Sequence, residues 1–456
     1  MRTVRIQDTL TGGLRELEPR EDARVGIYAC GPTVYGPVHV GNARPYVVFS
    51  LLKRFLEREG YQVTFVANVT DVNDKNYDAA RAAGRPSEEL AREMTRRYEE
   101  ETDRLGLGRP DHEPRASETI GAIVDLIQAL IDRDRAYATG GDVYFRVASF
   151  PEYGKLSNRS LEDMDQGEPD DAAPGGAVKE SPHDFALWKA RKPDEDTWWP
   201  APWGEGRPGW HIECSAMAEA ILGLDFEIHG GGSDLVFPHH ENEIAQTEAA
   251  RGRPLARLWM HNGMLEFDRE KMSKSVGNIT SLGAALDEVG PEVLLMYFAG
   301  AHYRSPMPYN EGELEQARNR VNRIRDFVRR LEPDGADPPE LDGVAERVLD
   351  ALADDFNTPE ALAQLFPWLT RAHSWLDAGE RFGPGRLGEL LRVLGLERLL
   401  EQDDAPDADA LRLLEEREAA RRERDFATAD ARRDELRALG WEVRDTPDGA
   451  TLVRLS

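Results

Sequence analysis

The sequence predicts an α/β protein in which helices cover a parallel β-sheet, followed by a helical bundle and a small α+β tail. Three observations support this prediction. A strand, a helix and a second strand follow one another between residues 25 and 67, which is the order of a βαβ unit. After residue 314 the apolar residues recur mostly at helical spacing. Near the C-terminus, "GWEVRDTPDGATLVRL" has the pattern of a hairpin that turns at residues 447–449.

The βαβ unit is predicted from two strand-like segments around an amphipathic helix. Residues 25–30 form an apolar run, and residues 61–67, "YQVTFVA", are rich in β-branched and aromatic side chains. Between them, residues 42–60 place apolar side chains at i, i+3 and i+4, and Gly60 stands where the helix should end. Glycines in the turn before this helix leave its N-terminus open to a phosphate.

The next part of the chain predicts an insertion into the α/β unit. Amphipathic helices are expected at residues 87–105 and 118–134, and a hairpin is expected around Gly140 and Gly141. The loop "DMDQGEPDDAAPGGAVKESP" follows, and the α/β pattern is expected to resume near Phe185. It then includes a strand at "LDFEIHG" and a helix after Pro238, a residue suited to a first helical position.

Composition restricts the possible classes of protein. No run approaches the roughly 18 apolar residues of a membrane-spanning helix, and no apolar segment follows the charged N-terminus, so neither a membrane protein nor a signal peptide is expected. Two distant cysteines argue against a disulfide framework and favour a reducing, cytoplasmic location. The net charge of −28 makes the chain a poor general binder of phosphate backbones, so any nucleic acid must be met by local arginine patches.

Only eight of the 57 basic residues are lysines. Two explanations of this charge pattern stay open. A GC-rich genome favours arginine over lysine, whereas high salt would screen the self-repulsion of an acidic chain.

Four scattered residues are candidate metal ligands. Cys30 and Cys214 are the two cysteines of the chain, and His239 and Glu243 are four residues apart, on one face of the predicted helix. Thiolate, imidazole and carboxylate together suit zinc. The ligands are not in a CxxC pattern, so two ordinary buried cysteines and a helix-capping histidine are an open alternative.

Three short motifs suggest nucleotide binding. "HVGN" places His39, Gly41 and Asn42 between a strand and a helix, and "HGGGSD", residues 229–234, resembles a glycine-rich turn. "KMSKS" contributes Lys271 and Lys274, whose ammonium groups would suit a departing pyrophosphate. Each motif taken separately is also explained by a polar turn, a tight turn or a solvated basic loop. Their joint occurrence favours a nucleotide site.

The chain resembles the cysteinyl-tRNA synthetases, which are class I aminoacyl-tRNA synthetases. The resemblance rests on "ACGPTVYGPVHVGNARPYVVF", "NVTDVNDK", "GWHIECSAM", "FEIHGGGSDLVFPHHENEIAQ", "KMSKS" and the tail "DFATADARRDELRALGWEVRDTPDGATLVR". It spans nearly the whole chain. "KMSKS" by itself indicates only the class, whereas "GWHIEC" combined with "HGGGSD" and "PHHENE" is specific to the members that handle cysteine.

The resemblance implies one zinc ion per chain, with Cys30, Cys214, His239 and Glu243 as its ligands. Zinc prefers a soft thiolate to a hydroxyl, so a substrate thiolate bound to the metal would separate cysteine from serine without an editing site.

The resemblance also implies roles in the reaction with ATP, which Mg²⁺ should accompany. His39 and Asn42 would contact the triphosphate, and Lys271 and Lys274 would close over the pyrophosphate. Trp210 would line the amino-acid pocket. The further positions implied for substrate or ATP are Gly41, Thr70, Gly231 and Asp234, with Lys274 again.

Two positions depart from the family pattern. The class signature usually has histidine where this chain has Asn42, and Asn73 stands where the family often has aspartate. An asparagine still donates a hydrogen bond to a phosphate or ribose oxygen, but it cannot carry a positive charge.

With the family's fold, a Rossmann-like catalytic domain is expected at residues 1–115 and 181–260, interrupted by an inserted connective segment at 116–180. Residues 261–312 would carry the KMSKS loop and a stem-contact region, 313–400 a helical tRNA-binding domain, and 401–456 an anticodon-binding tail. Arginines of the helical domain would reach phosphates; these are Arg318, Arg320, Arg323 and Arg325. The expected partners are ATP, L-cysteine and tRNA(Cys), bound by a monomer with no membrane contact.

Two alternatives stay open. A ligase that activates cysteine in the same way but passes it to an amino sugar would look alike around the zinc and ATP sites, although it would need no anticodon-reading tail. An inactive relative that only binds RNA or zinc would not need "KMSKS" together with all four ligands.

Overall fold

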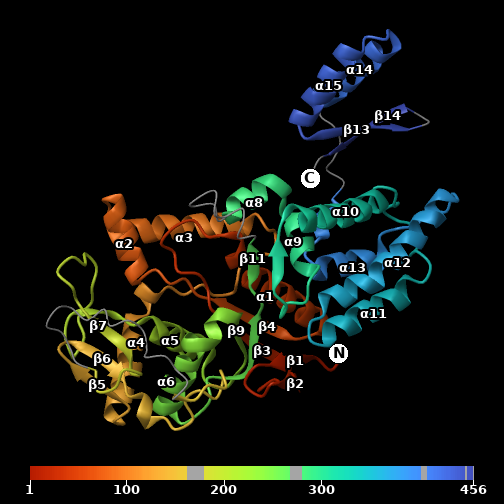
Figure 1. Ribbon diagram of the computed structural model, residues 1–456. Coiled ribbons are helices and arrows are strands. Elements are labelled where there is room, and N and C mark those ends of the chain that lie inside the picture. The colour runs from red at the N-terminus through yellow and green to blue at the C-terminus, as the bar shows by residue number, and fades with distance from the viewer. Residues whose placement is uncertain (162–178, 268–279, 402–407, 447–448, 455–456) are drawn as a thin grey trace.

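The central feature of the fold is a four-stranded parallel sheet with the strand order β10–β9–β3–β4 (Figure 1). The computed structural model of the protein describes residues 1–161, 179–267, 280–401, 408–446 and 449–454. The strands are β3 (Arg24–Ala29), β4 (Gln62–Ala67), β9 (Phe226–Gly232) and β10 (Ala256–Asn262). The chain moves outward in opposite directions from β3 and β9, so these two strands flank a topological switch point. The predicted α/β class is confirmed.

Two helices make the crossovers of this sheet. α1 (Val40–Glu59) joins β3 to β4, and α6 (Glu241–Arg251) joins β9 to β10. α1 ends at Gly60, which has a φ of 101°, a backbone conformation that glycine adopts without strain. The hairpin of β1 (Arg5–Asp8) and β2 (Gly13–Glu16) lies beside β10, where the buried Asp8 carboxylate accepts a hydrogen bond from Trp259 N at 2.9 Å.

A second, antiparallel sheet lies in the inserted part of the chain and has the order β5–β6–β7–β8. Its strands are β5 (Ala136–Thr139), β6 (Asp142–Phe145), β7 (Phe185–Ala190) and β8 (Gly206–Pro208). The hairpin predicted around Gly140 and Gly141 is confirmed. β7 was expected to belong to the resumed α/β pattern, but it pairs with β6. The reason is that its apolar side chains complete a separate core with those of α4 and α5.

The helices around this insertion follow β4 and β8. They are α2 (Asp74–Ala83), α3 (Ser87–Asp103), α4 (Ile120–Asp132) and α5 (Trp210–Leu222). Asp74, the first residue of α2, forms ion pairs with Lys189 at 2.8 Å and with the buried Arg207. Ion pairs as well as packing therefore hold the insertion against the segment that follows β4.

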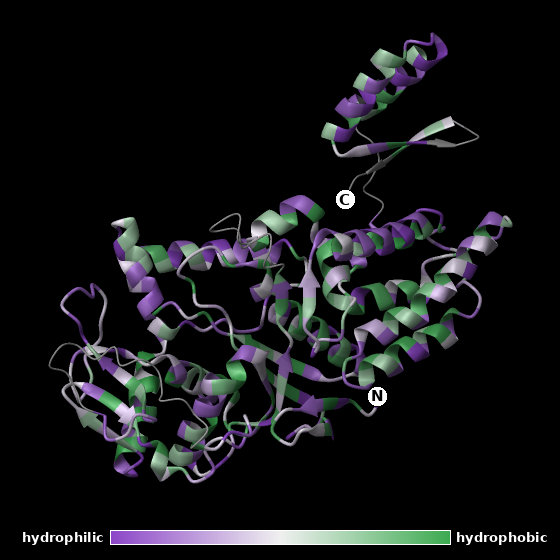
Figure 2. Cartoon of the chain, in the orientation of Figure 1, coloured by the Kyte–Doolittle hydropathy of each residue, from purple (hydrophilic) through white to green (hydrophobic). Residues whose placement is uncertain are grey.

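The helical region packs on the side of the parallel sheet that α1 covers. It contains the short parallel pair β11 (Leu265–Phe267) and β12 (Met307–Tyr309), with α8 (Leu282–Val289) and α9 (Pro291–Ala299) between these strands in the chain. The helices that follow β12 are α10 (Glu311–Val328), α11 (Leu341–Ala353), α12 (Thr358–Asp377) and α13 (Gly385–Val393). One continuous apolar core runs from the strands through α1 into these helices. Figure 2 shows hydrophobic residues on the inner strands and packed helices and mostly hydrophilic residues on α10.

The C-terminal tail is a small unit with its own core (Figure 1). It consists of α14 (Ala408–Arg422), α15 (Phe426–Ala438) and the predicted hairpin of β13 (Trp441–Thr446) and β14 (Gly449–Arg454). The core contains Leu413, Leu436 and Trp441. Arg444 of the tail lies 3.1 Å from the carboxylate of Asp326 in α10.

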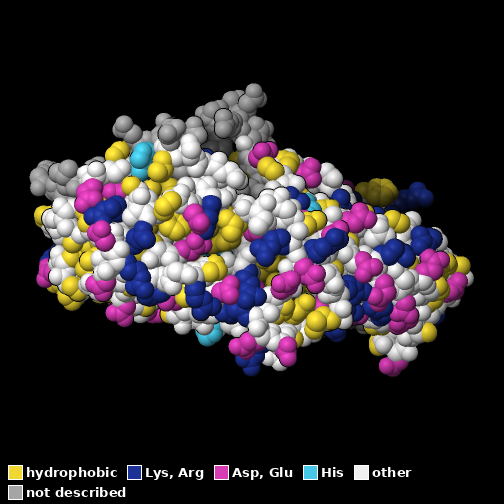
Figure 3. Space-filling model, turned by 90° about the horizontal axis from the view of Figure 1, so that it is seen from below, with side chains coloured by type: hydrophobic (Ala, Val, Ile, Leu, Met, Phe, Trp, Pro, Cys, Tyr) yellow, Lys and Arg dark blue, Asp and Glu magenta, His cyan; other side chains and the backbone are white. Residues whose placement is uncertain are grey.

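Charges of both signs are intermixed on the surface seen in Figure 3. Most arginines on α3, for example, pair with glutamates one turn away; Arg96 and Glu100 lie 2.7 Å apart. Among the described residues, no helix combines the length and apolar character that crossing a bilayer requires.

Asp355 joins the N-terminal strand to the helical region. Its buried carboxylate accepts hydrogen bonds from Gln7 N at 2.8 Å, from the Tyr303 hydroxyl at 2.7 Å and from Arg304 Nε at 2.8 Å. The backbone of Asp355 has a φ of 61°, a conformation that aspartate and asparagine tolerate better than most residues. Three segments far apart in the chain thus depend on one side chain.

We predict that Asp355→Ala lowers the stability by about 3 kcal/mol, because it leaves the Gln7 backbone N–H and the buried Tyr303 hydroxyl without their acceptor and removes the partner of Arg304. The matched control is Asp354→Ala. Asp354 is half exposed and pairs only with Arg5 at 2.8 Å, so its loss should cost less than about 1 kcal/mol. Thermal unfolding of both variants beside the parent chain measures the difference, and equal shifts would contradict this assignment.

Candidate active site

The candidate site lies at the carboxyl ends of the parallel strands, above the switch point between β3 and β9. A cavity of about 290 Å³ opens there. In open α/β sheets, ligands bind at this position because the loops diverge on either side of the switch point. The residues of the sequence motifs that line the cavity are Cys30, His39, Gly41, Asn42, Trp210, Gly232 and Asp234.

Four buried donors form a cluster at the floor of this cavity. Cys30 follows β3 and Cys214 lies on α5. His239 lies in the π-helical turn Val236–His240 that precedes α6, and Glu243 lies in the first turn of α6. Their ligand atoms all lie within 4.8 Å of one another. His239 Nε2 is 2.9 Å from a Glu243 oxygen, and Cys30 Sγ is 3.6 Å from the same imidazole nitrogen. This set of two sulfurs, one nitrogen and one oxygen fits the coordination preferences of a structural or substrate-binding metal ion.

The charges of the cluster are mutually dependent. Burial raises the pKa of the Cys30 thiol well above its ordinary value, whereas a hydrogen bond from Cys30 lowers the pKa of Cys214 to about 6. Burial would lower the pKa of His239, but the neighbouring Glu243 and Cys214 raise it to about 10. Burial opposes ionisation of Glu243, yet His229 and His239 hold its pKa well below its usual range. Glu243 is therefore ionised, whereas Cys30 keeps its proton and His239 carries a positive charge, so a metal ion would displace protons from both when it binds.

A second group of donors shares two members with the first. Cys30 and Glu243 also lie together with His229 and His240, and these four ligand atoms again fall within 4.8 Å. His240 Nε2 is 3.3 Å from Cys30 Sγ, and His229 Nε2 is 2.9 Å from the other Glu243 oxygen. The sequence analysis did not assign His229 or His240 as metal ligands. Their positions in "HGGGSD" and "PHHENE" were the available signal.

Hydrogen bonds orient one imidazole of each group. His239 Nδ1 lies 3.0 Å from His211 Nδ1, which directs Nε2 of His239 toward the cluster. His240 Nδ1 lies 2.7 Å from His261 Nε2, and His261 in turn bonds Thr9 Oγ1 at 2.8 Å. The first group contains two thiols, which zinc-type ions prefer, so we take Cys30, Cys214, His239 and Glu243 as the candidate ligands.

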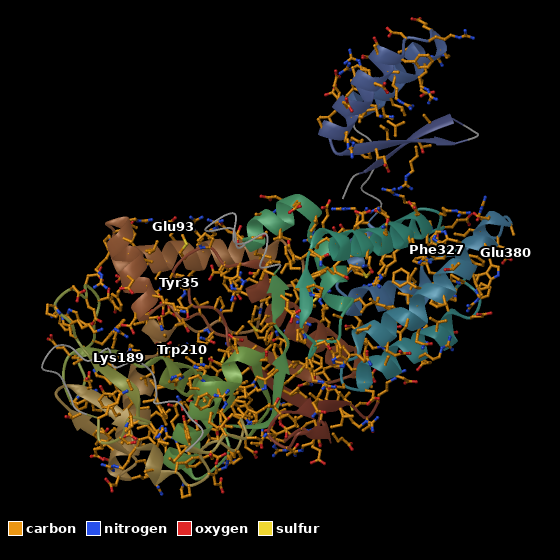
Figure 4. The ribbon with its side chains drawn as sticks, viewed as in Figure 1. Tyr35, Glu93, Lys189, Trp210, Phe327 and Glu380 are labelled. Carbon is orange, nitrogen blue, oxygen red and sulfur yellow. The ribbon has the colours of Figure 1, made fainter. Side chains whose placement is uncertain are left out.

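Trp210 connects the cluster with the cavity. Its ring stacks on that of His239, with centroids 4.4 Å apart and an angle of 27°. Trp210 is the first residue of α5, and Cys214 follows one turn later. One helix therefore contributes both a donor of the cluster and a wall of the cavity. Figure 4 labels Trp210 at this place.

The two asparagines that depart from the family pattern act as helix caps. The side-chain oxygen of Asn42 accepts a hydrogen bond from His39 N at 3.2 Å, at the start of α1. That of Asn73 accepts one from Lys75 N at 3.1 Å, at the start of α2. Each of the two asparagines thus stabilises the start of a helix. The amide nitrogen of Asn42 remains available on the side of the cavity.

His39 lies at the N-cap of α1, and its Nδ1 is buried without a hydrogen-bond partner among the described residues. Burial lowers its pKa, against the opposing effect of Asp234. His39 therefore lines the cavity as a neutral imidazole. A side chain at Gly41 would collide with it, since a Cβ there would lie 2.9 Å from His39 Nδ1.

The glycine-rich stretch differs from the sequence prediction. "HGGGSD" was expected to be a turn, but residues 229–232 belong to β9 and the turn begins only at Ser233. The glycines are needed for close packing, since a Cβ at Gly230 would lie 2.3 Å from Met260 O. Gly232 lines the cavity, whereas a side chain at Gly231 would face Leu235 and His240.

Thr70 is also placed differently from its expected role. It is buried beneath the loop after β3, where its backbone bonds Pro32 and Val34, and it does not line the cavity. Lys271 and Lys274 of "KMSKS" lie outside the described residues.

Arg44 is a further residue that the sequence analysis missed. It is buried on α1, and its guanidinium donates to Gly263 O at 2.5 Å and to His302 O at 3.1 Å. Gly263 lies directly after β10 and lines the cavity. Arg44 therefore fixes the helix of "HVGN" to the opposite wall of the site. Its position within the quoted "HVGNARPY" gave no signal of this contact.

Family models match three parts of the chain. The model described as tRNA synthetases class I (C) catalytic domain matches residues 16–319. The DALR domain matches residues 347–381, and the cysteinyl-tRNA ligase anticodon binding domain matches residues 403–454.

Curated relatives match over the full length of the chain. The cysteine–tRNA ligase of Caldicellulosiruptor saccharolyticus is 43% identical and is covered completely by 99% of this chain. That of Halorhodospira halophila is 45% identical, with 98% of both chains covered.

Solved structures show the same fold at low identity. Methionyl-tRNA synthetase from Mycobacterium tuberculosis with methionyl-adenylate aligns with a TM-score of 0.59 and 17% identity, covering 83% of this chain and 88% of that chain. A LeuRS–tRNA–LeuAMS complex from Agrobacterium radiobacter aligns with a TM-score of 0.56 and 11% identity, covering 84% of this chain and 83% of that chain.

We predict that Cys214→Ala and His239→Ala abolish stoichiometric binding of zinc, because each removes one of four ligands. His240→Asn is the matched control from the second group. It should lower the affinity for the metal about 10- to 100-fold through its contact with Cys30, without changing the stoichiometry. Elemental analysis and competition with a chelator measure both quantities. Loss of the metal in His240→Asn but not in Cys214→Ala would assign the ligands to the second group instead.

Proposed function

The chain belongs to the cysteine–tRNA ligase family of class I aminoacyl-tRNA synthetases, and from this premise we propose that it charges tRNA(Cys) with cysteine. The observation that carries the proposal is the buried Cys30–Cys214–His239–Glu243 cluster at the floor of a cavity at the switch point. A site for a small thiol thus adjoins a site suited to a nucleotide.

The first step proposed is the activation of cysteine. Its carboxylate attacks the α-phosphorus of ATP, which forms cysteinyl-adenylate and releases pyrophosphate. No protein nucleophile is required, so the residues act by positioning and by stabilising charge. His39 and Asn42 would donate to phosphate oxygens at the start of α1, and Gly41 would allow the nucleotide to approach the backbone closely. Lys271 and Lys274 would neutralise the pyrophosphate, and Mg²⁺ would accompany ATP.

The selection of cysteine is assigned to the cluster of four donors. Cys30, Cys214, His239 and Glu243 would hold one zinc ion, whose chemistry is to bind a substrate thiolate in preference to a hydroxyl. The chain supports this selection with buried donors and with His211, which orients His239. Trp210 would enclose the side chain of the substrate, and the carboxylate of Asp234 at the cavity rim would suit its ammonium group.

In the second proposed step, a ribose hydroxyl at the 3′ end of tRNA attacks the acyl carbon and expels AMP. The tail supports a tRNA partner, since it matches an anticodon-binding family and exposes arginines. Arg422, Arg424, Arg433 and Arg437 are exposed, and none has a carboxylate partner within the described part of the chain. On α10, by contrast, Arg318 pairs with Glu315, and Arg323 donates to Thr370 Oγ1 at 2.7 Å. The tail is the better candidate for contact with phosphates.

The division into domains follows the same proposal. Residues 1–115 would form the first half of the catalytic domain, and 261–312 the KMSKS loop and stem-contact region. Residues 313–400 would form the helical tRNA-binding domain, and 401–456 the anticodon-binding tail. The insertion, expected at 116–180, would extend to about residue 208, since β8 completes its sheet. The second half of the catalytic domain would then begin at α5.

We predict that, of the twenty amino acids, cysteine supports ATP–pyrophosphate exchange well and serine does not. A chelator strong enough to remove the metal should abolish the preference, because the donor that separates sulfur from oxygen is lost. Zinc added back in excess is the control for damage by the chelator. A zinc-free chain that still selected cysteine over serine would refute the role proposed for the cluster.

We also predict that a chain ending at residue 403 keeps its exchange rate and loses most of its transfer to tRNA. The tail has its own core, so its removal should leave the catalytic residues in place. Exchange and aminoacylation are measured in parallel on the same preparation, and exchange serves as the control for folding.

A matched pair of variants tests the charge of the tail more finely. Arg422→Gln combined with Arg433→Gln removes two exposed arginines without carboxylate partners, and should raise the KM for tRNA. Arg412→Gln removes one that pairs with Glu416 at 2.6 Å, and should have little effect. Transfer to tRNA that the truncated chain keeps at the full-length rate would show that the tail does not read the anticodon.

A further inference from the structure

Tyr35 lies at the mouth of the cavity with its ring exposed to solvent. It is 46% exposed, although the neighbouring Val34 is fully buried. Both Tyr35 and Trp210 line the cavity, and Figure 4 shows them between α2 and α5. Few large apolar side chains among the described residues are exposed to this extent, and an exposed aromatic ring beside a ligand site is a common feature of recognition surfaces.

The backbone directly before Tyr35 is held by the segment after β4 and by α2. Val34 N donates to Thr70 O at 3.1 Å, and Thr70 N donates to Pro32 O at 3.1 Å, so the loop after β3 is tied to the segment after β4. The buried side chain of Asn76 donates to Val34 O at 2.9 Å. A rigid loop thus presents the ring, and little conformational entropy would be lost when a ligand stacks on it.

A basic group without a carboxylate partner accompanies the ring. The ammonium of Lys75 lies 5.5 Å from the ring centroid of Tyr35, and Lys75 lines the same cavity. Lys53, Lys155 and Lys189 each lie within 2.8 Å of a carboxylate oxygen. Lys75 has no such ion pair within the described ranges, in a chain with far more acidic than basic residues. Its charge is therefore available to an anion.

The position of this pair in the sheet separates it from the part of the cavity assigned to ATP. Gly263 and Met264 follow β10, whereas Lys75 follows β4 on α2, and β10 and β4 are the opposite edges of the sheet. His39, Gly41 and Asn42 begin the helix between them. An adenylate held between "HVGN" and the β10 edge would leave the β4 edge open, next to Trp210 and the acyl group.

We propose that Tyr35 and Lys75 form the subsite for the 3′-terminal adenosine of tRNA, with the base stacked on the ring and its 5′-phosphate beside the ammonium. The inference rests on the proposed function and assigns a second nucleotide position within its site. Stacking on an aromatic ring and a single phosphate contact are the usual means of holding an unpaired nucleotide. In this position the terminal ribose faces the acyl carbon from the side that AMP does not occupy. Tyr35 and Lys75 act as binding residues for the transfer step and have no role in activation.

The test separates the two steps of the reaction. Tyr35→Ala should slow single-turnover transfer from preformed cysteinyl-adenylate to tRNA about 10- to 100-fold, as expected from the loss of one stacked base. Tyr35→Phe keeps the ring and should transfer at nearly the parent rate. Lys75→Gln should raise the tRNA concentration needed for half-maximal transfer. In all three variants ATP–pyrophosphate exchange with cysteine should match the parent chain.

A tRNA transcript with 2-aminopurine in place of the terminal adenine provides a direct readout. Its fluorescence should be quenched on binding to the parent chain and to Tyr35→Phe, but not to Tyr35→Ala.

Equal loss of exchange and transfer in a folded Tyr35→Ala would place the ring in the ATP site and overturn the proposal. Unchanged transfer together with unchanged quenching would also overturn it, because the ring would then be an ordinary surface residue. If Tyr35→Ala does not fold, two other measurements decide. They are the quenching of 2-aminopurine fluorescence by Tyr35→Phe and the tRNA concentration that Lys75→Gln needs for half-maximal transfer. A parent chain without cysteine-dependent exchange would instead refute the proposed function.

Discussion

The buried carboxylate of Glu243 is the constraint on which the active-site end of the sheet depends. A fully buried charge costs several kcal/mol unless opposite charge or strong donors surround it. His239 and His229 each lie 2.9 Å from one of its oxygens, and Cys30 Sγ lies 3.5 Å away. These partners come from the turn before α6, from β9 and from the residue after β3. The carboxylate therefore fixes the two middle strands and the helix between β9 and β10 at a single point.

The arrangement around Glu243 also explains how the donors that would select a thiol and the site for a nucleotide share one cavity. Cys30 both belongs to the cluster and lines the cavity, because it is the residue that directly follows β3. The loop that follows leads within ten residues to His39 and the start of α1. A single connection after one strand thus supplies a donor to the cluster and the N-terminus of a helix to the phosphates. Arg44 then holds that helix against the wall that follows β10.

Stability and recognition are assigned to different groups in the rest of the chain. Most arginines of the body are used in pairs, such as Arg54 with Glu397 at 2.7 Å and Arg58 with Glu389 at 2.6 Å, which join α1 to the region around α13. The strongly acidic composition is thereby compatible with a rigid body. Groups without an acidic partner among the residues that the structure describes, such as Lys75 at the cavity and Arg433 in the tail, lie where a polyanion would bind.

The sequence by itself determined the βαβ unit, the hairpins and the helices, because these elements depend on local periodicity, turn residues and caps. It also determined which four side chains to consider as ligands, through motifs that carry a family resemblance. Only the tertiary structure decided that β7 belongs to the insertion, that the glycines after His229 continue a strand, and that His229 and His240 form a second group around Glu243. These facts depend on contacts between residues far apart in the chain. A strand shows its pattern locally, but the sheet that it joins is chosen by the core that its side chains complete.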